Sequence, residues 1–140
     1  CGNNKTLPEA TGLDMIKKDE VITSLNGNPT SAADINADVS EPLPFANGSV
    51  DVVIARHVLE HLMDSVKVLT QWKTVLKRGG KMIIAVPNNG QLLSIPMNYE
   101  HCHGWNPEAM QHLLEALGMK VVTQIDPHNG VSFITIAEKL

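Results

Sequence analysis

Aromatic residues and cysteines are scarce in this sequence of 140 residues. Phe, Trp and Tyr together make up 4% of it, and Cys1 and Cys102 are its only cysteines. Two cysteines cannot form a disulfide framework, so we expect a reducing compartment, the cytoplasm. No apolar run approaches the roughly 20 residues that span a bilayer, and no signal peptide is visible, so we expect no association with a membrane.

Positive charge is not in excess either. The sequence has 11 Lys and Arg against 15 Asp and Glu, a formal net charge of −4, and its basic residues are scattered. Binding of nucleic acid requires clustered Lys and Arg, so we expect no nucleic-acid partner. What the sequence does have is 43% hydrophobic residues, enough for one core, without a linker or a repeat. We therefore predict a single domain over residues 1–140.

Two apolar runs indicate the centre of a sheet. Residues 50–55 (VDVVIA) and 82–86 (MIIAV) are rich in β-branched side chains, as is typical of strands buried on both faces of a parallel sheet. Between them, apolar residues recur at the spacing of a helix, at Val68, Leu69, Trp72, Val75 and Leu76. Asp64 or Ser65 can cap this helix, which we expect to continue through Lys77 and Arg78 to Gly79. The pattern predicts a parallel βαβ unit.

The last third of the sequence predicts a second helix and a hairpin. Asn106 is a helix cap, Pro107 suits the first helical position and Gly118 the end, and the buried stripe is Met110, Leu113, Leu114 and Leu117. Residues 120–125 and 132–137 then predict an antiparallel hairpin.

The first fifty residues give a weaker pattern. We expect short strands within residues 11–16 and 31–36, a weakly helical or irregular stretch between them, and a loop over residues 41–49 that turns at Asn47-Gly48. The whole pattern is that of an α/β fold.

Residues 56–61, RHVLEH, contain the H-x-x-E-H order of a family of zinc peptidases. In such enzymes two histidines one helical turn apart bind the metal, and the glutamate activates water. His57 directly follows the predicted strand, so only about one and a half turns of helix could form before Asp64. A zinc hydrolase using His57, Glu60 and His61 is therefore the least favoured function.

His101 and His103 form a second candidate pair, because alternate side chains of an extended segment point to one side. No second pair of ligands follows, so a polar active-site segment or an ordinary loop is favoured. We predict no metal site.

Polar residues follow each predicted parallel strand. Asp14 ends the strand within residues 11–16, Asp38 follows the second strand, Arg56 and His57 follow the third, and residues 87–89 (PNN) follow the fourth. Ligands of open α/β sheets bind outside the carboxyl ends of the strands. We expect these groups to gather along one edge of the sheet as a binding site.

The same region resembles a known family. The matching pieces are the acid before LPF, the N-G-S-x-D entry to the strand at 50–55, VLEHL after it, VLKRGG, and a strand ending in VPN. Together they are similar to the central half of class I S-adenosylmethionine-dependent methyltransferases, and the likeness extends back through CGNNK and GLDM and forward to the final hairpin. The resemblance implies a Rossmann-like, doubly wound and mostly parallel sheet, with S-adenosylmethionine as cofactor.

The resemblance also implies roles for residues of the first segments. Cys1 and Gly2 resemble the end of the glycine-rich loop that passes the methionine part of the cofactor. Asp14 resembles the acid that accepts hydrogen bonds from both ribose hydroxyls, and a carboxylate suits two donors because it offers several acceptor sites. Met15 would lie against the adenine.

Further along the chain, Asp38 resembles the acid that accepts from the adenine amino group, with Val39 beside it. Arg56 and His57 stand where the family lines the pocket near the reactive methyl.

Two features depart from common patterns. The distance from Gly2 to Asp14 is too short for the helix that binds a dinucleotide pyrophosphate, which argues against NAD and is typical of methyltransferases whose first helix is trimmed to a loop. The family's first strand would precede Cys1 and is missing from this sequence, so we expect a longer natural chain.

For the reaction we expect methyl transfer to a small-molecule acceptor, with the protein chiefly positioning the reactants. An acceptor that carries a proton needs a general base, and His57, His101 and His103 are the candidates. Residues 98–105 (NYEHCHGW) would cross the mouth of the pocket as a lid, with Tyr99 and Trp105 framing the acceptor. The alternative to an enzyme is a non-catalytic binding module that keeps the fold. The sequence says nothing about the oligomeric state.

Overall fold

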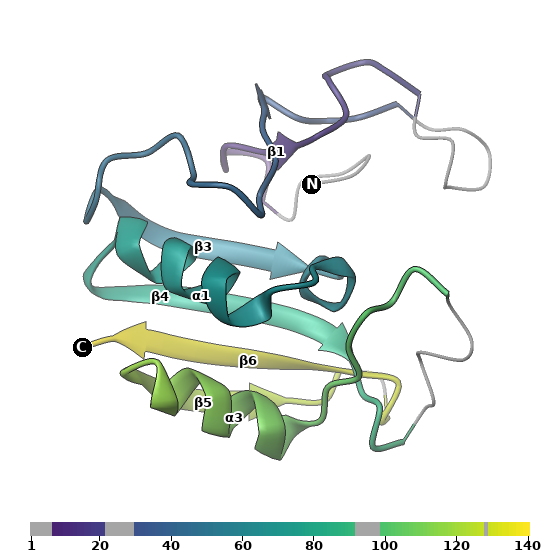
Figure 1. Cartoon of the computed structure of the whole chain (residues 1–140), viewed down its shortest axis with the longest axis vertical. Helices are drawn as coiled ribbons and strands as arrows, with labels where there is room; N and C mark the ends of the chain where they lie inside the picture. Colours follow the sequence, from purple (N-terminus) through teal and green to yellow (C-terminus); the bar gives the residue numbers. More distant parts are fainter. Residues whose placement is uncertain (1–6, 22–29, 92–98, 128) are drawn as a thin grey trace. The chain divides into compact units, whose positions relative to one another are not determined.

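The computed structural model describes residues 7–21, 30–91, 99–127 and 129–140 (Figure 1). The chain forms two compact units, Cys1–Pro44 and Phe45–Leu140, and each is described on its own below. Both contain paired strands, and the second also contains helices, so the predicted α/β class is confirmed. The single domain predicted over residues 1–140 stays a prediction. In the described ranges, no helix has both the length and the apolar character needed to cross a membrane.

The second unit is built on a mixed sheet of four strands in the order β3 (Val50–Arg56), β4 (Leu76–Pro87), β6 (Ser132–Lys139) and β5 (Met119–Ile125). β3 and β4 are parallel, whereas β6 is antiparallel to both β4 and β5, which confirms the predicted βαβ unit and the predicted hairpin. Figure 1 shows the four strands side by side. In β4, Met82, Ile84 and Val86 are fully buried, whereas the residues between them are half-buried. The prediction that β3 is buried on both faces is wrong: it is an edge strand of this sheet, Val52 is 43% exposed, and only Ala55 of its residues is buried.

Helix α1 (Ser65–Val75) begins as predicted but ends earlier. The side chain of Asp64 caps it by accepting a hydrogen bond from the backbone N–H of Lys67 at 2.9 Å. The predicted apolar stripe is buried along its length, at Val68, Leu69, Trp72, Val75 and Leu76.

The predicted continuation of α1 through Lys77 and Arg78 is wrong, because β4 already starts at Leu76. Leu76 is extended, fully buried and paired with Val50. Lys77 donates a hydrogen bond to the Asp51 carboxylate of β3 at 2.7 Å. Burial of Leu76 and pairing with β3 therefore outweigh the helix propensity of Lys77 and Arg78. Gly79 does adopt the predicted left-handed conformation, with φ of 77°, but within β4.

Helix α3 (Pro107–Ala116) agrees with its prediction. The Asn106 side chain accepts a hydrogen bond from the Ala109 N–H at 2.7 Å, and Gly118 has φ of 73° where the chain turns into β5. Met110 and Leu114 are fully buried, and α3 lies against β5 and β6 (Figure 1). The cap defines the start of this helix, and the buried stripe packs it onto β5 and β6.

The first unit contains two parallel strands of two residues each, β1 (Leu13–Asp14) and β2 (Ile35–Asn36). Both are shorter than the predicted segments 11–16 and 31–36. Side chains supplement this short ladder: the Asp34 carboxylate accepts from the Gly12 N–H at 2.8 Å, and the Asn36 amide donates to the Met15 carbonyl at 2.5 Å. Part of the stretch predicted as irregular, residues 22–29, lies outside the described residues. The loop predicted over residues 41–49 is confirmed.

Candidate active site

The chain leaves β3 abruptly at its carboxyl end. Arg56 is the last residue of the strand, and His57 has a left-handed backbone with φ of 51°, which is uncommon for a residue other than glycine. The His57 N–H donates to the Ala85 carbonyl of β4 at 2.9 Å. Asn88 and Asn89 follow the end of β4. Because β3 and β4 are parallel, these predicted polar residues do meet at one edge of the sheet.

Directly after His57 the chain forms a single short 3-10 turn, η1 (Leu59–His61). Leu59 is fully buried and Glu60 is only 1% exposed, so this turn is anchored in the core. Three residues of 3-10 helix do not place His57 and His61 on one face of an α-helix, which is the arrangement of a zinc peptidase. The local structure therefore opposes that function.

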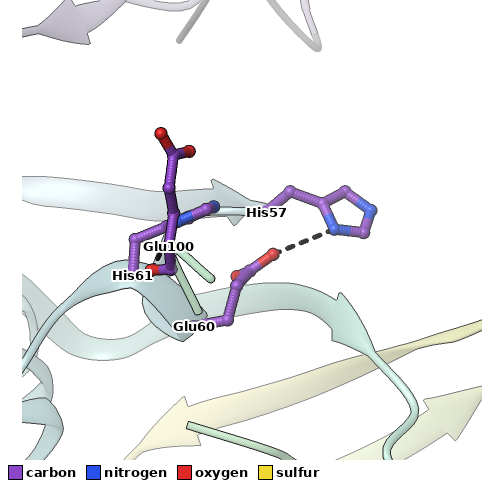
Figure 2. A network of polar contacts seen from close by, with 4 residues as sticks. All are labelled: His57, Glu60, His61 and Glu100. Atoms are coloured by element: carbon purple, nitrogen blue, oxygen red, sulfur yellow. Dashed lines mark hydrogen bonds and ion pairs between the residues drawn. The ribbon is translucent and has the colours of Figure 1, made fainter. Parts of the chain in front are cut away.

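His57 and Glu60 form a polar pair (Figure 2). His57 Nδ1 lies 3.1 Å from Glu60 Oε1, with the His57 side chain 49% exposed and the Glu60 side chain 1% exposed. A carboxylate accepts from a ring N–H, so Nδ1 donates and the other ring nitrogen is left to take or give a proton. A buried carboxylate that orients a half-exposed imidazole is the arrangement found behind histidine general bases.

Residues 99–105, which we term the docked segment, lie against η1. The Glu60 carbonyl accepts from the backbone N–H groups of Cys102, at 2.7 Å, and of His103, at 3.3 Å. His61 Nδ1 is 3.2 Å from the Glu100 carbonyl (Figure 2). At its end, the docked segment pairs with the residues after β4, where the Asn89 N–H donates to the Trp105 carbonyl. The segment therefore lies at the carboxyl edge of β3 and β4, and its role as a lid over the pocket stays a prediction.

The three predicted catalytic histidines have different surroundings. His57 pairs with Glu60, whereas the ring of His101 stands edge-on against that of His61, with centroids 4.8 Å apart. His103 lies beside Trp105, and its Nε2 is 3.1 Å from the Met63 carbonyl. Tyr99 is 93% exposed. The rings of His57 and His101 thus contact residues of η1, whereas the ring of His103 contacts Met63, just after η1.

Glu60 and His61 are the site residues that sequence reasoning undervalued. Their ligand atoms and that of His101 all lie within 4.8 Å of one another, so the three could hold a metal ion. The H-x-x-E-H motif contains Glu60 and His61, but it suggested His57, and not His101, as the other histidine of a metal site. The third comes from a segment 40 positions away, which no local pattern reveals.

In the first unit, Asp14 and Asp38 lie at the carboxyl ends of β1 and β2, which are parallel neighbours. The Asp14 carboxylate accepts from the Ile16 N–H at 3.1 Å, and the neighbouring Met15 side chain is 67% exposed. Asp38 accepts from the N–H and the hydroxyl of Ser40, at 2.8 and 2.6 Å, with Val39 half-buried between them.

This edge fits the ribose and adenine of a nucleoside. It combines a carboxylate that can accept from hydroxyl groups with an exposed thioether that offers an apolar surface to a flat ring. Cys1 and Gly2, also predicted to bind the cofactor, lie outside the described residues.

Comparison with known proteins identifies the family. The methyltransferase domain family matches residues 4–84, which is more than half of the chain. The chain belongs to this methyltransferase domain family. The match includes Asp14, Asp38, Arg56 and His57 and stops before the docked segment. The resemblance seen in the sequence is therefore confirmed.

Relatives of this methyltransferase domain extend the comparison. A protein of Mycolicibacterium smegmatis named "Probable S-adenosylmethionine-dependent methyltransferase" is 31% identical over 91 residues, which are 63% of this chain and 35% of the relative. This chain thus spans about a third of the length of that curated relative.

Solved structures share the fold. An S-adenosylmethionine-dependent methyltransferase from Archaeoglobus fulgidus has a TM-score of 0.61 at 20% identity, covering 75% of this chain and 66% of that one. The 1,6-didemethyltoxoflavin-N1-methyltransferase of Burkholderia thailandensis, solved with 1,6-didemethyltoxoflavin and S-adenosylhomocysteine, has a TM-score of 0.60 at 16% identity. It covers 75% of this chain and 49% of that one. The predicted Rossmann-like architecture is confirmed, with β6 as the antiparallel strand.

Proposed function

We propose that this methyltransferase domain binds S-adenosylmethionine and transfers its methyl group to a small-molecule acceptor. The observation that carries the proposal is the family match over residues 4–84, which contains the acid at the end of β1 and the histidine at the end of β3. The Burkholderia enzyme of this fold, solved with a small-molecule ligand, supports an acceptor of that kind. The near absence of cysteine supports a cytoplasmic setting.

On the cofactor side, Asp14 accepts hydrogen bonds from the ribose hydroxyls and Met15 covers one face of the adenine. Asp38 accepts from the adenine amino group, beside Val39. Arg56 and His57 line the pocket near the methyl group. When bound, the cofactor supplies a methyl group on a positively charged sulfur, so these residues need only bind and orient it.

On the acceptor side, His57 takes the proton that the acceptor loses when it is methylated. Its Nδ1–H is held by Glu60 Oε1 at 3.1 Å, which fixes the ring orientation and leaves Nε2 as the base. Its 49% exposure gives an acceptor access to the ring, and the buried Glu60 carboxylate stabilises the imidazolium that forms. His101 and His103 in the docked segment contribute to binding of the acceptor.

The proposal is tested by measuring S-adenosylhomocysteine released from S-adenosylmethionine in the presence of pools of small molecules with O–H or N–H groups. We expect release with at least one pool, and we expect His57→Gln to lower its rate by about 100-fold or more, the usual contribution of a general base. The matched control is His112→Ala, an exposed histidine on α3.

Two outcomes would contradict parts of the proposal. Cofactor binding without release in any pool would favour the non-catalytic binding module. If His57→Gln released S-adenosylhomocysteine at an unchanged rate, His57 would not be the general base.

A further inference from the structure

Glu60 is a buried carboxylate whose acceptor capacity is only half used. Its side chain is 1% exposed; Oε1 pairs with His57, and no group in the described ranges donates a hydrogen bond to Oε2. Burying a carboxylate without full compensation is costly, and native proteins pair such groups or coordinate metals with them. One half-exposed histidine compensates only one of the two oxygens. The second oxygen therefore lacks a positive partner.

His61 keeps one ring nitrogen available as a metal ligand. Its Nδ1 lies 3.2 Å from the Glu100 carbonyl, and a carbonyl can only accept, so Nδ1 carries the proton. Nε2 of the neutral ring is then an acceptor. A ring N–H held by a backbone carbonyl is the outer-shell contact that metal-binding histidines usually make. Figure 2 shows His61 and Glu60 with these two different partners.

His101 completes a group of three. Its ring stands edge-on to that of His61, and the ligand atoms of Glu60, His61 and His101 lie within 4.8 Å of one another. Two backbone hydrogen bonds from Cys102 and His103 to the Glu60 carbonyl hold the docked segment at this distance. Ligand atoms around tetrahedral zinc are about 3.4 Å apart, so these atoms must come closer together when the ion binds.

We propose that Glu60, His61 and His101 bind one divalent transition-metal ion of the zinc class. Two imidazoles and one carboxylate suit zinc and its neighbours, whereas magnesium and calcium prefer sites made of oxygen alone. Two hydrogen bonds orient these ligands. His57 Nδ1 donates to Glu60 Oε1, and His61 Nδ1 donates to the Glu100 carbonyl. The proposed site replaces the expectation from the sequence that the chain has no metal site.

Three protein ligands leave a fourth position open. Water fills that position or, where the proposed function holds, an oxygen of the methyl acceptor does. Binding of the ion is measured without cofactor or acceptor, and all of its ligands belong to the unit Phe45–Leu140. A failure to bind metal and a failure to bind cofactor are therefore separate results.

The test uses the whole chain, treated with chelator and dialysed, and titrated with ZnCl2 by calorimetry in the absence of cofactor. We expect one Zn²⁺ per chain, weaker binding of Mg²⁺, and a d–d absorption band when Co²⁺ is added in place of zinc. Glu60→Gln and His101→Ala should each weaken zinc binding by more than about 100-fold. His57→Ala, which changes an outer-shell contact, should weaken it by about 10–100-fold.

His112→Ala is the matched control, because it removes an exposed histidine of α3 and should leave zinc binding unchanged. Circular dichroism establishes that each variant is folded, and His101→Ala, at a half-buried position, keeps the test valid should Glu60→Gln fail to fold. Absence of stoichiometric zinc binding by the folded chain would overturn the proposal. Zinc binding that Glu60→Gln or His101→Ala leaves intact would overturn it as well.

Discussion

Removal of His57 should destabilise the metal-free protein through the charge that it leaves behind. His57 supplies the hydrogen bond to Glu60 Oε1, and Glu60 is buried. A hydrogen bond to a charged group contributes about 1.5–3 kcal/mol, and the 49% exposure of His57 reduces that value by solvent screening. We therefore expect His57→Ala to lower the free energy of unfolding by about 1–2 kcal/mol.

A double-mutant cycle isolates this pair. Glu60→Gln keeps an acceptor oxygen but removes the buried charge, so it should change stability by less than about 1 kcal/mol. In that background His57→Ala should cost only about 0.5 kcal/mol, the loss of a neutral hydrogen bond. The coupling energy is then about 1 kcal/mol.

The assay is urea unfolding with chelator present, followed by the fluorescence of the buried Trp72. His112→Ala, measured in both backgrounds, controls for the loss of any histidine. A coupling energy below about 0.3 kcal/mol would refute the view that His57 compensates the Glu60 charge.

Three further predictions concern other parts of the chain. Leu69→Ala in α1 should lower stability by about 2–5 kcal/mol, because Leu69 is fully buried; a loss under about 1 kcal/mol in urea unfolding would contradict its place in the core. The hydrogen bond and charge of Lys81 hold the pKa of Glu138 below its usual value of 4.5, so this pair should stabilise the fold above that pH and lose its effect as the pH falls through the lowered pKa. Glu138→Gln should remove this small dependence, and an unchanged pH profile of Tm would contradict it. His103→Ala should slow methyl transfer without weakening cofactor binding, and weaker cofactor binding would contradict the place of the docked segment on the acceptor side.

The sequence predicted those elements whose local pattern is distinct. β3 and the centre of β4 are long apolar runs, and α3 has a cap, a proline and a glycine at the expected positions. The end of α1 was wrong because Leu76 is held by the core and by Val50, partners that a helical pattern does not reveal. The two-residue strands β1 and β2 give too little sequence for their limits to be predicted.

The site was predictable in position but not in its contacts. That His57 would stand at a strand end followed from the apolar run before it, and the structure agrees. That Glu60 would be buried, and that His101 would come to lie beside His61, depends on backbone hydrogen bonds between η1 and the docked segment. Such contacts join residues about 40 positions apart and have no periodic signature. Local motifs therefore indicated the residues without indicating which of them are partners.

We propose that this methyltransferase domain binds S-adenosylmethionine through Asp14, the acid at the end of β1. The most direct measurement is a calorimetric titration of the chain with S-adenosylhomocysteine, with Asp14→Ala beside the control Glu9→Gln, an exposed acid of the same unit. We expect binding that Asp14→Ala weakens by about 100-fold, the equivalent of about 2.7 kcal/mol for the lost charged hydrogen bonds, and that Glu9→Gln leaves unchanged. Absence of binding by the folded chain, or equal binding by Asp14→Ala, would contradict it.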